Sequence, residues 1–410
     1  MTYWNLALWA LAAAFAIPML IWAIECTAAL VLAPRKPGNL NQARPSVTIL
    51  VAAHNEAGGI RRTLESLFPQ ISARDSVVVI ADNCTDETAN IARECGATVV
   101  ERRDPARRGK CYAMEFGVRS LDSHPADIVI VVDADCIALP DAISHLALTA
   151  FRTGRPAQAS YYLESPLVPE PHRQLAALAF LIKNVVRPGG LARLGGPCFL
   201  NGSGMAFPST IIRSIDWANG RLAEDYWATV DIALAGHLPV FCEESRICSR
   251  LPGQNRALAT QHTRWIQGHL ESMLAQGPRL LLRAVKERRP GLLVLALDNL
   301  VPPFSLLILG WLTGFAITAT AGLLGAALGP ATLLAACGLW SGVLFIVLTQ
   351  RFGRVELRKA LAEVPRYMLS RVPLLAAFVF GRQRNWIPTA RDPQPSAGAA
   401  TDEETSGKPR

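Results

Sequence analysis

Two long apolar segments constrain the fold of this chain more than any other feature. Residues 5–32 contain one charged side chain, Glu25, and residues 292–348 also contain one, Asp298. A helix rises about 1.5 Å per residue and the hydrocarbon core of a bilayer is roughly 30 Å thick, so the first segment can form one membrane-spanning helix. A cleaved secretory signal is the alternative, but the segment lacks a positively charged start and is too long for one.

The second apolar segment is long enough for two spans but not for three, with a turn near residues 322–330. Pro302 and Pro303 are predicted to kink the first of these two helices. Glu25 and Asp298 lie near the predicted helix ends, where headgroup water makes a charge less costly. This position favours solvated side chains over functional acids within the membrane.

Lysine and arginine side chains flank both apolar segments. The positive-inside rule places such flanks on the cytoplasmic side, so residues 1–33 and 291–350 hold the spans and residues 34–290 form a cytoplasmic domain at a bacterial inner membrane. The formal net charge of +8 then lies beside lipid, which indicates anionic headgroups rather than nucleic acid as the partner. Residues 351–392 are predicted to form membrane-associated helices and residues 393–410 a disordered tail.

The cytoplasmic region alternates between strand and helix patterns. Three continuous β-branched runs at residues 47–52, 77–81 and 128–133 are typical of strands that are covered on both faces, and residues 97–102 indicate a further short strand. Helical patterns at residues 58–71, 86–97 and 110–121 separate these strands. The sequence therefore predicts an α/β domain with a mainly parallel sheet and flanking helices.

The three long strands all end in acids or amides. The endings read AHNE at residues 53–56, ADNCTD at 81–86 and DADC at 133–136. Ligands of open α/β sheets gather beyond the carboxyl ends of the strands, so these endings predict a binding site at one edge. The alternative is that Asn83 or Thr85 merely caps a helix, since both residue types are common caps.

Asp133 and Asp135 stand one residue apart at the end of a predicted strand. Two carboxylates so close repel each other unless a divalent cation lies between them. Mg²⁺ or Mn²⁺ typically takes one or two protein carboxylates and fills its other positions with water and substrate phosphates, so a diphosphate ligand is expected. The usual phosphate-binding glycine motifs and zinc-type cysteine spacings are absent from the sequence, and its nine cysteines are expected to be reduced and packed in the interior.

Seven short motifs occur in the order AHNEA, ADNCTDET, GK, DADC, NGSGMAF, AEDYW and QHTRW. This series resembles the family 2 glycosyltransferases of the GT-A fold, the group that includes cellulose, chitin-oligosaccharide and hyaluronan synthases. The resemblance covers about residues 46–270, and the flanking membrane segments extend it to nearly the whole chain. It implies a GT-A-like sheet, a nucleotide-sugar donor and a Mg²⁺ or Mn²⁺ cofactor.

The resemblance implies a role for each matching acid and lysine of the first half of the domain. Glu56 and Asp82 are expected to meet the uracil or ribose of a UDP-sugar, and Lys110 its diphosphate. Asp133 and Asp135 match the metal-binding pair, with Asp135 the more direct ligand and Asp133 also close to the nucleotide sugar. All five positions are therefore predicted to lie in one donor site.

The acid pair Glu224 and Asp225 in AEDYW matches the catalytic base, with Asp225 at the position of the base itself. A carboxylate there takes a proton from the acceptor hydroxyl while the diphosphate departs from the opposite face, which inverts the anomeric carbon. The alternative for both acids is a solvated helix start stabilised by the helix dipole. Asn83 departs from the family pattern, since many members carry a second aspartate there.

Gln261, Arg264 and Trp265 are spaced three and four residues apart in an amphipathic helical pattern, so they share one face. They match the QxxRW signature, in which the arginine contacts diphosphate and the tryptophan packs beside the acceptor sugar. An interfacial helix with Trp265 as a membrane anchor is the alternative. His262 does not share this face and is predicted to be incidental. The glycines of NGSGMAF (residues 201–207) fit either a close approach to substrate or a tight turn.

These motifs predict inverting transfer of a sugar to a growing cell-surface polysaccharide, by repeated addition, with export or assembly proteins as possible partners. The alternative is a single addition to a lipid-linked glycan. A transport or scaffold protein with a degenerate domain, and a nucleotidyltransferase, are hypotheses of other classes. Residues 175–188 are predicted to form a helix on the membrane surface, because Lys183 and Arg187 lie four apart beside apolar side chains.

Overall fold

The β-branched runs form the centre of one sheet. The computed structural model describes residues 3–34, 43–164, 170–218, 220, 223–250, 255–353, 357–370 and 373. Within them, the strands β1 (Val47–Ala53), β2 (Ser76–Asp82) and β3 (Thr98–Arg102) are parallel to one another, and β4 (Ile128–Asp133) pairs parallel with β1. The four strands predicted from the sequence are therefore confirmed.

Four further strands complete the sheet, which has eight strands among the described residues, in the order β3-β2-β1-β4-β7-β6-β8-β5. β7 (Met205–Pro208) is antiparallel to both β4 and β6 (Ala157–Glu164). β8 (Val240–Arg250) is parallel to β6 and antiparallel to β5 (Cys136–Ala138). Parallel pairs dominate around the strand ends that carry the acidic motifs, as expected.

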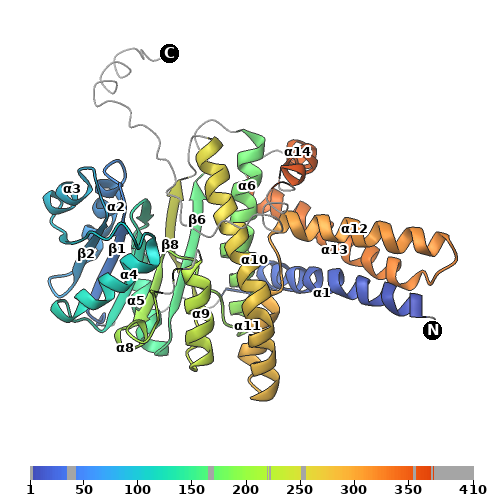
Figure 1. Cartoon of the computed structure of the whole chain (residues 1–410), viewed down its shortest axis with the longest axis horizontal. Coiled ribbons are helices and arrows are strands. Elements are labelled where there is room, and N and C mark those ends of the chain that lie inside the picture. The colour runs from blue at the N-terminus through green and yellow to red at the C-terminus, as the bar shows by residue number, and fades with distance from the viewer. Residues whose placement is uncertain are drawn as a thin grey trace, which may run out of the picture.

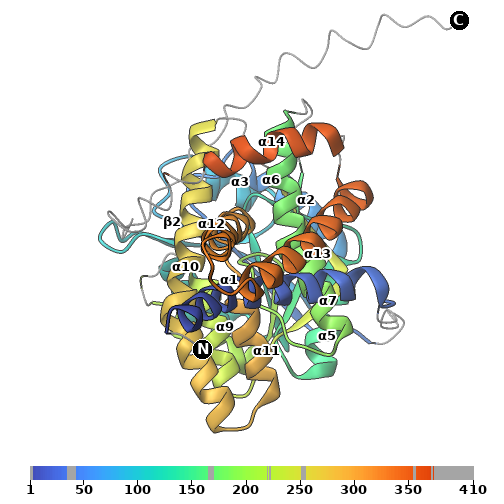
Figure 2. The same cartoon turned by 90° about the vertical axis from the view of Figure 1, so that its right-hand side faces the viewer.

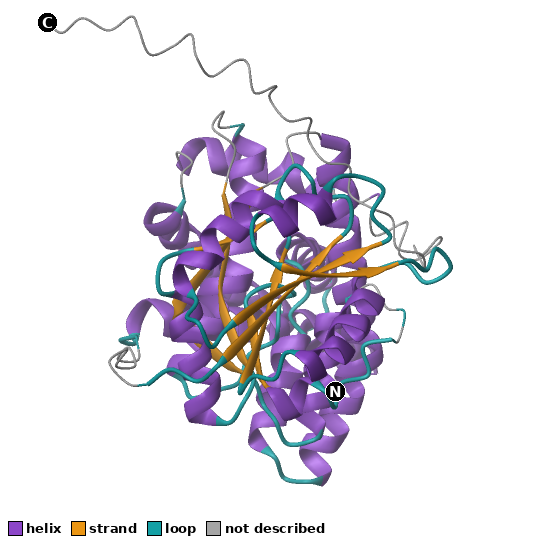
Figure 3. Ribbon diagram, turned by 90° about the vertical axis from the view of Figure 1, so that its left-hand side faces the viewer, coloured by secondary structure: helices purple, strands orange, loops and turns teal. Residues whose placement is uncertain are grey.

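Helices cover both faces of the sheet, as Figure 3 shows. In β1, Val47, Ile49 and Val51 pack into the core on one face and Leu50 into the core on the other. Because both sets of side chains are buried, the strand is apolar throughout. The first face is covered by α2 (Ile60–Leu67), α3 (Thr88–Glu94) and α5 (Ala142–Thr153), and the second by α4 (Lys110–Ser120), α8 (Ser209–Ile212) and α9 (Glu224–Leu234); η1 (Phe68–Gln70) and η2 (Leu121–Ser123) are short 3-10 turns.

Three apolar helices pack together and project away from the sheet (Figures 1 and 2). They are α1 (Tyr3–Val31), α12 (Phe304–Leu323) and α13 (Gly329–Phe352), each long and apolar enough to cross a membrane. Gly314 of α12 faces the ring of Phe15 in α1, where a larger side chain would clash. Small residues at such positions let apolar helices approach closely.

A fourth helix of sufficient length and apolarity occurs in the part of the chain that the structure describes. It is continuous from α6 (Pro171–Leu181) through the π-helical turn η3 (Ile182–Val186) to α7 (Arg187–Arg193). In Figure 1, α6 and α10 (Asn255–Lys286) run steeply across the direction of the projecting helices, between them and the sheet. The location of residues 175–188 on the membrane surface stays a prediction.

Two expectations for the apolar segments are wrong. Pro302 and Pro303 do not kink a helix but separate two, because α11 (Pro290–Asn299) ends before them and α12 begins after them. Headgroup water does not solvate Glu25 and Asp298, since the guanidinium of Arg187 binds both carboxylates.

The last described helix, α14 (Leu357–Leu369), packs beside α6 at one edge of the bundle (Figure 2). Its sequence belongs to the predicted membrane-associated region 351–392. Most of residues 371–392 and the predicted disordered tail at residues 393–410 lie outside the described residues.

Candidate active site

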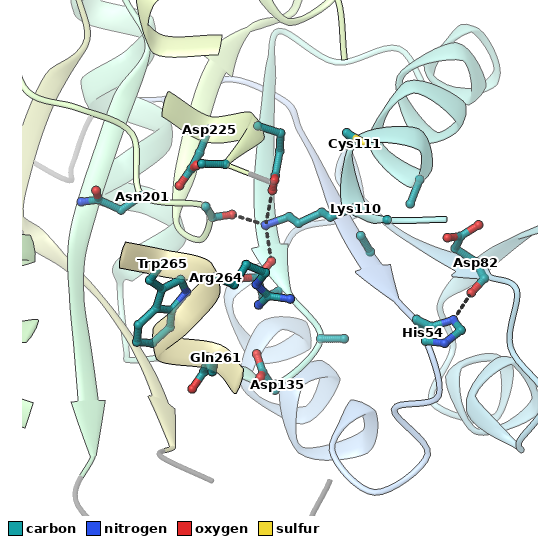
Figure 4. Close-up of a pocket in the computed structure, with 18 of the residues that line it drawn as sticks. His54, Asp82, Lys110, Cys111, Asp135, Asn201, Asp225, Gln261, Arg264 and Trp265 are labelled. Atoms are coloured by element: carbon teal, nitrogen blue, oxygen red, sulfur yellow. Dashed lines mark hydrogen bonds and ion pairs between the residues drawn. The ribbon is translucent and has the colours of Figure 1, made fainter. Parts of the chain in front are cut away.

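A cleft of about 640 Å³ opens at the carboxyl ends of β1, β2 and β4. Figure 4 shows His54 and Asp82 at one end of this cleft, Trp265 and Gln261 at the other, and Lys110 between them. Every site residue predicted from the sequence lines this cleft: Glu56, Asp82, Lys110, Asp133, Asp135, Glu224, Asp225, Gln261, Arg264 and Trp265. The structure therefore brings together residues that are more than 200 positions apart in the sequence.

The end of the cleft predicted to hold the nucleoside is built from two cross-linked loops. The Thr85 N–H donates to Asn55 Oδ1 at 2.8 Å, and the Glu56 N–H donates to Thr88 Oγ1 at 2.8 Å. Glu56 and Asp82 are 7% and 4% exposed, so they offer little more than their carboxylate edges to the cleft. These hydrogen bonds fix the loops that carry both acids.

Asp82 is held by Arg102, whose Nη1 donates to Asp82 Oδ1 at 2.6 Å. Burial raises the pKa of Asp82, and the guanidinium of Arg102 opposes that rise. Asn83 adopts a left-handed conformation (φ 50°), which asparagine tolerates better than most residues. Its side chain donates to Asp82 Oδ1 and to the Asp104 carbonyl and accepts from the Asp104 N–H, so Asn83 braces the loop and is not a helix cap.

Lys110 is the first residue of α4 and lies at the centre of the cleft. Its ammonium group forms an ion pair with Asp133, donates to the Gly202 carbonyl at 2.6 Å and lies 3.8 Å from Glu224 Oε1. Burial lowers the pKa of Lys110, but the carboxylates of Asp133 and Glu224 outweigh it and leave the pKa above its ordinary value. The side chain is therefore a permanent positive charge in the cleft.

Asp133, Asp135 and Cys136 can bring one ligand atom each within 4.8 Å of one another. Burial raises the pKa of the Cys136 thiol well above its ordinary value, and a soft sulfur is in any case a poor ligand for a hard cation. The two carboxylates remain, and a hard oxygen-seeking ion such as Mg²⁺ or Mn²⁺ fits this donor set. The backbone N–H of Asp133 donates to Ser203 Oγ at 3.1 Å, which fixes the end of β4.

Glu224 and Asp225 begin α9 and line the cleft rather than the outer surface. Burial raises the pKa of Glu224 to about 7, although the charge of Lys110 opposes this, and burial also raises the pKa of Asp225. A side chain on Gly202 (φ 83°) would place its Cβ 3.4 Å from Asp225 Oδ2. The glycine therefore both makes the turn before β7 and keeps the space beside Asp225 open.

Gln261, Arg264 and Trp265 share the face of α10 that lines the cleft, as their spacing predicts. Burial raises the pKa of Asp133, and the positive charges of Lys110 and Arg264 counteract this effect, so the charge of Arg264 acts on Asp133. The Trp265 ring lies 5.3 Å from the ring of Phe180 in α6. The three side chains thus face the cleft and not the outer side of the helix.

Several residues of the cleft were not predicted to be functional. Lys183 lies with its ammonium group 5.3 Å from the ring centroid of Tyr226, and the His269 ring lies 5.2 Å from the same ring. Asn184 and Asn201 also line the cleft. Their only signal in the sequence is polarity within an apolar helix or beside a glycine turn, which is also typical of ordinary surface positions.

The cleft contains the arrangement that the resemblance to GT-A glycosyltransferases implies. Paired carboxylates end a parallel strand, Lys110 lies between them and a second acid pair, and Arg264 faces the same cleft. Residues 45–268, more than half of the 410 residues, match the family described as "Glycosyltransferase like family 2". The chain belongs to this family.

Individual relatives match over shorter stretches. A 4,4'-diaponeurosporenoate glycosyltransferase of Staphylococcus aureus is 38% identical over 113 residues, which cover 27% of this chain and 30% of that protein. The probable glycosyltransferase YdaM of Bacillus subtilis is 24% identical over 238 residues, 55% of each chain. The chain thus spans between about a third and about half of the length of these curated relatives.

A solved structure shares the fold over nearly the whole chain. The mannosyltransferase PcManGT from Pyrobaculum calidifontis, in complex with GDP-Man and Mn²⁺, has a TM-score of 0.57 at 16% identity, over 92% of this chain and 99% of that one. The α/β GT-A fold and the family are therefore confirmed. The narrower resemblance to cellulose, chitin-oligosaccharide and hyaluronan synthases, and the role of each site residue, stay predictions.

Proposed function

We propose that this protein is an inverting, metal-dependent glycosyltransferase that moves a sugar from a nucleotide-sugar donor, a UDP-sugar in the first instance, to the hydroxyl group of a membrane-associated acceptor. The observation that carries the proposal is that Lys110, Asp133, Asp135, Asp225 and Arg264 line one cleft. The cleft thus contains groups to bind the donor and the metal, and a base to deprotonate the acceptor.

Asp135 and Asp133 would hold the divalent cation, which supplies positive charge to the donor diphosphate. Lys110 and Arg264 face the same end of the cleft as these acids and stabilise the charge that develops on the leaving diphosphate. Glu56 and Asp82, on their cross-linked loops, bind the nucleoside. The donor is thereby fixed with its anomeric carbon toward Asp225.

Asp225 is the base of the reaction. Its carboxylate takes the proton of the acceptor hydroxyl as the oxygen forms a bond to the anomeric carbon, and the bond to the diphosphate oxygen breaks on the opposite face. The electron pair of that bond leaves with the nucleoside diphosphate. Burial raises the pKa of Asp225, which makes it a stronger base than an exposed aspartate.

The acceptor we propose is a growing cell-surface glycan, with Trp265 stacked on its terminal sugar and the catalytic domain on the cytoplasmic side of the inner membrane. The QxxRW resemblance favours repeated addition, and export or assembly proteins are the partners we propose for it. A single addition to a lipid-linked glycan is the second candidate, and it is favoured by an apolar crevice that joins the cleft between α6, α10 and α1.

The test is release of nucleoside diphosphate by the purified chain with Mn²⁺ and a panel of UDP- and GDP-sugars. Replacing the proposed base, Asp225→Asn, should lower the rate by about 10²–10⁴-fold. The matched control is Asp231→Asn on the same helix, an exposed acid that pairs with Arg279, and it should leave the rate unchanged.

Equal rates for wild type and Asp225→Asn would contradict the proposed base. Release of pyrophosphate in place of a nucleoside diphosphate would instead assign a nucleotidyltransferase. No turnover with any donor would favour a transport or scaffold protein with a degenerate domain.

A further inference from the structure

A second, smaller cavity adjoins the catalytic cleft on the side of the projecting helices. This crevice has a volume of about 100 Å³ and lies between α1, α6, α10 and the start of α12. Phe180, Lys183, Trp265 and His269 line both the cleft and the crevice. The two cavities are therefore neighbours that share one wall.

The walls of the crevice away from the cleft are mainly apolar, and Arg187, a charged residue among them, is bound to Glu25 and Asp298. The rings of Trp22 in α1 and Phe304 in α12 stack at 5.4 Å, and Ala176, Ala179 and Ile266 add aliphatic surface. These helices belong to the junction between the projecting bundle and the sheet domain (Figure 1). Apolar walls of this kind suit a hydrocarbon chain, whereas a sugar chain would need hydrogen-bond partners along its length.

The inner end of the crevice, where it meets the cleft, is basic and polar. Among the residues that the structure describes, Lys183 has no ion-pair partner, and its ammonium group lies over the Tyr226 ring. Two buried atoms, His269 Nδ1 at this junction and Asn184 Oδ1 in the adjoining cleft, have no hydrogen-bond partner among those residues either. Buried polar groups are normally satisfied, so these atoms are available to a polar ligand.

Lys183 also feels the charges of three neighbours, none of which binds it directly. The carboxylates of Asp225 and Asp298 favour its charged form, and the guanidinium of Arg187 opposes it. A cation placed between an apolar crevice and the proposed base suits an anion that is attached to a hydrocarbon chain. A phosphate group fits best, because it offers several acceptor oxygens to a lysine and to neighbouring donors.

We propose that the acceptor is a lipid-linked sugar phosphate, with its hydrocarbon chain in the crevice, its phosphate at Lys183 and its sugar in the cleft with one hydroxyl at Asp225. The assignment rests on the proposed function and, of the two acceptors named there, selects the lipid-linked glycan as the molecule that Asp225 deprotonates. Lys183 and the crevice then select the acceptor, and Trp265, which lines both cavities, packs beside the acceptor sugar.

The test measures binding of geranyl phosphate, a short prenyl monophosphate, to the full chain in phosphatidylcholine nanodiscs by calorimetry. Geraniol lacks the anion and inorganic phosphate lacks the chain. Saturable binding of geranyl phosphate should exceed that of either fragment by at least about tenfold, because charge-assisted hydrogen bonds and chain burial both contribute.

Two variants separate the two halves of the subsite. Lys183→Gln should weaken geranyl phosphate about tenfold and leave geraniol unchanged, since only the anion is affected. Ala179→Trp fills the crevice and should weaken both ligands. The matched controls are Lys286→Gln, an exposed lysine of α10, and Ala177→Trp, which lies on α6 but does not line the crevice. Both controls should bind like the wild type.

Binding of UDP with Mn²⁺ serves as a check that each variant is folded and as a test of the proposed function itself. If UDP and Mn²⁺ bind to none of the proteins, the proposed function fails. If they bind to all, but geranyl phosphate binds to none or equally to all, or inorganic phosphate binds as tightly as geranyl phosphate, the acceptor assignment is wrong. A water-soluble product formed equally by wild type and Ala179→Trp would also overturn it.

Discussion

Two clusters of ionised side chains in this protein have nearly the same composition but different surroundings. In the cleft, Lys110 lies between Asp133 and Glu224. At the base of the bundle, Arg187 of α7 binds Glu25 of α1 and, close to α12, Asp298 of α11. Each cluster is one base held between two acids.

The two clusters differ in the number of acids that surround the base. The Arg187 guanidinium donates from Nε to Glu25 at 2.6 Å and from Nη2 to Asp298, so its planar fork uses both acids. The cluster in the cleft is joined by further acids, Asp135 and Asp225, and opens into a cavity of about 640 Å³. Its excess negative charge can hold a divalent cation. Charge balance, not composition, distinguishes a catalytic cluster from a structural one.

The largest effect on stability is expected from Arg187→Met, which leaves two buried carboxylates without a partner. We expect a loss of about 3–5 kcal/mol in the free energy of unfolding, measured by reversible denaturation in detergent. Arg213→Met, which breaks an exposed pair with Asp122, should cost no more than about 1 kcal/mol.

A triple variant sharpens this prediction. Combining Arg187→Met with Glu25→Gln and Asp298→Asn removes all three charges, and it should recover much of the lost stability because no uncompensated charge remains. If Arg187→Met alone is as stable as the wild type, the cluster does not hold the bundle to the catalytic domain.

In the cleft, Asp135→Asn should leave stability almost unchanged but weaken Mn²⁺ binding in the presence of UDP by about 100-fold, because an amide is a poorer ligand for a hard cation than a carboxylate. Calorimetric titration with Mn²⁺ measures this. Asp122→Asn on the surface is the control, and a similar affinity in all three proteins would exclude Asp135 from the metal site.

The smallest effect concerns pH. Burial raises the pKa of Glu224 to about 7, so the acid pair takes up a proton as the pH falls through neutrality. The wild-type transfer rate should therefore fall a few-fold between roughly pH 8 and pH 6. Glu224→Gln removes the titratable carboxyl and its negative charge beside Asp225. The transfer rate of this variant should therefore vary less over that pH range. An identical pH profile for both proteins would show that Glu224 does not titrate with the base.

Some of these features were predictable because they depend on local sequence. The continuous β-branched runs identify β1, β2 and β4, and the acids after them fall at one sheet edge because the strands are parallel. β7 was not predicted, since it has only four residues and owes its place to pairing with β4 and β6. The pair Glu224 and Asp225 was predictable only through the family resemblance, because acids are common in the first turn of any helix.

The sequence by itself determined the apolar helices, the parallel core of the sheet and the face shared by Gln261, Arg264 and Trp265, because periodicity and side-chain polarity act over a few residues. Only the tertiary structure decided which charges meet. It placed Lys183 beside the crevice, Arg187 between Glu25 and Asp298, and Lys110 between Asp133 and Glu224. Residues so far apart in the chain become neighbours only through packing, and the local sequence does not determine which of them will meet.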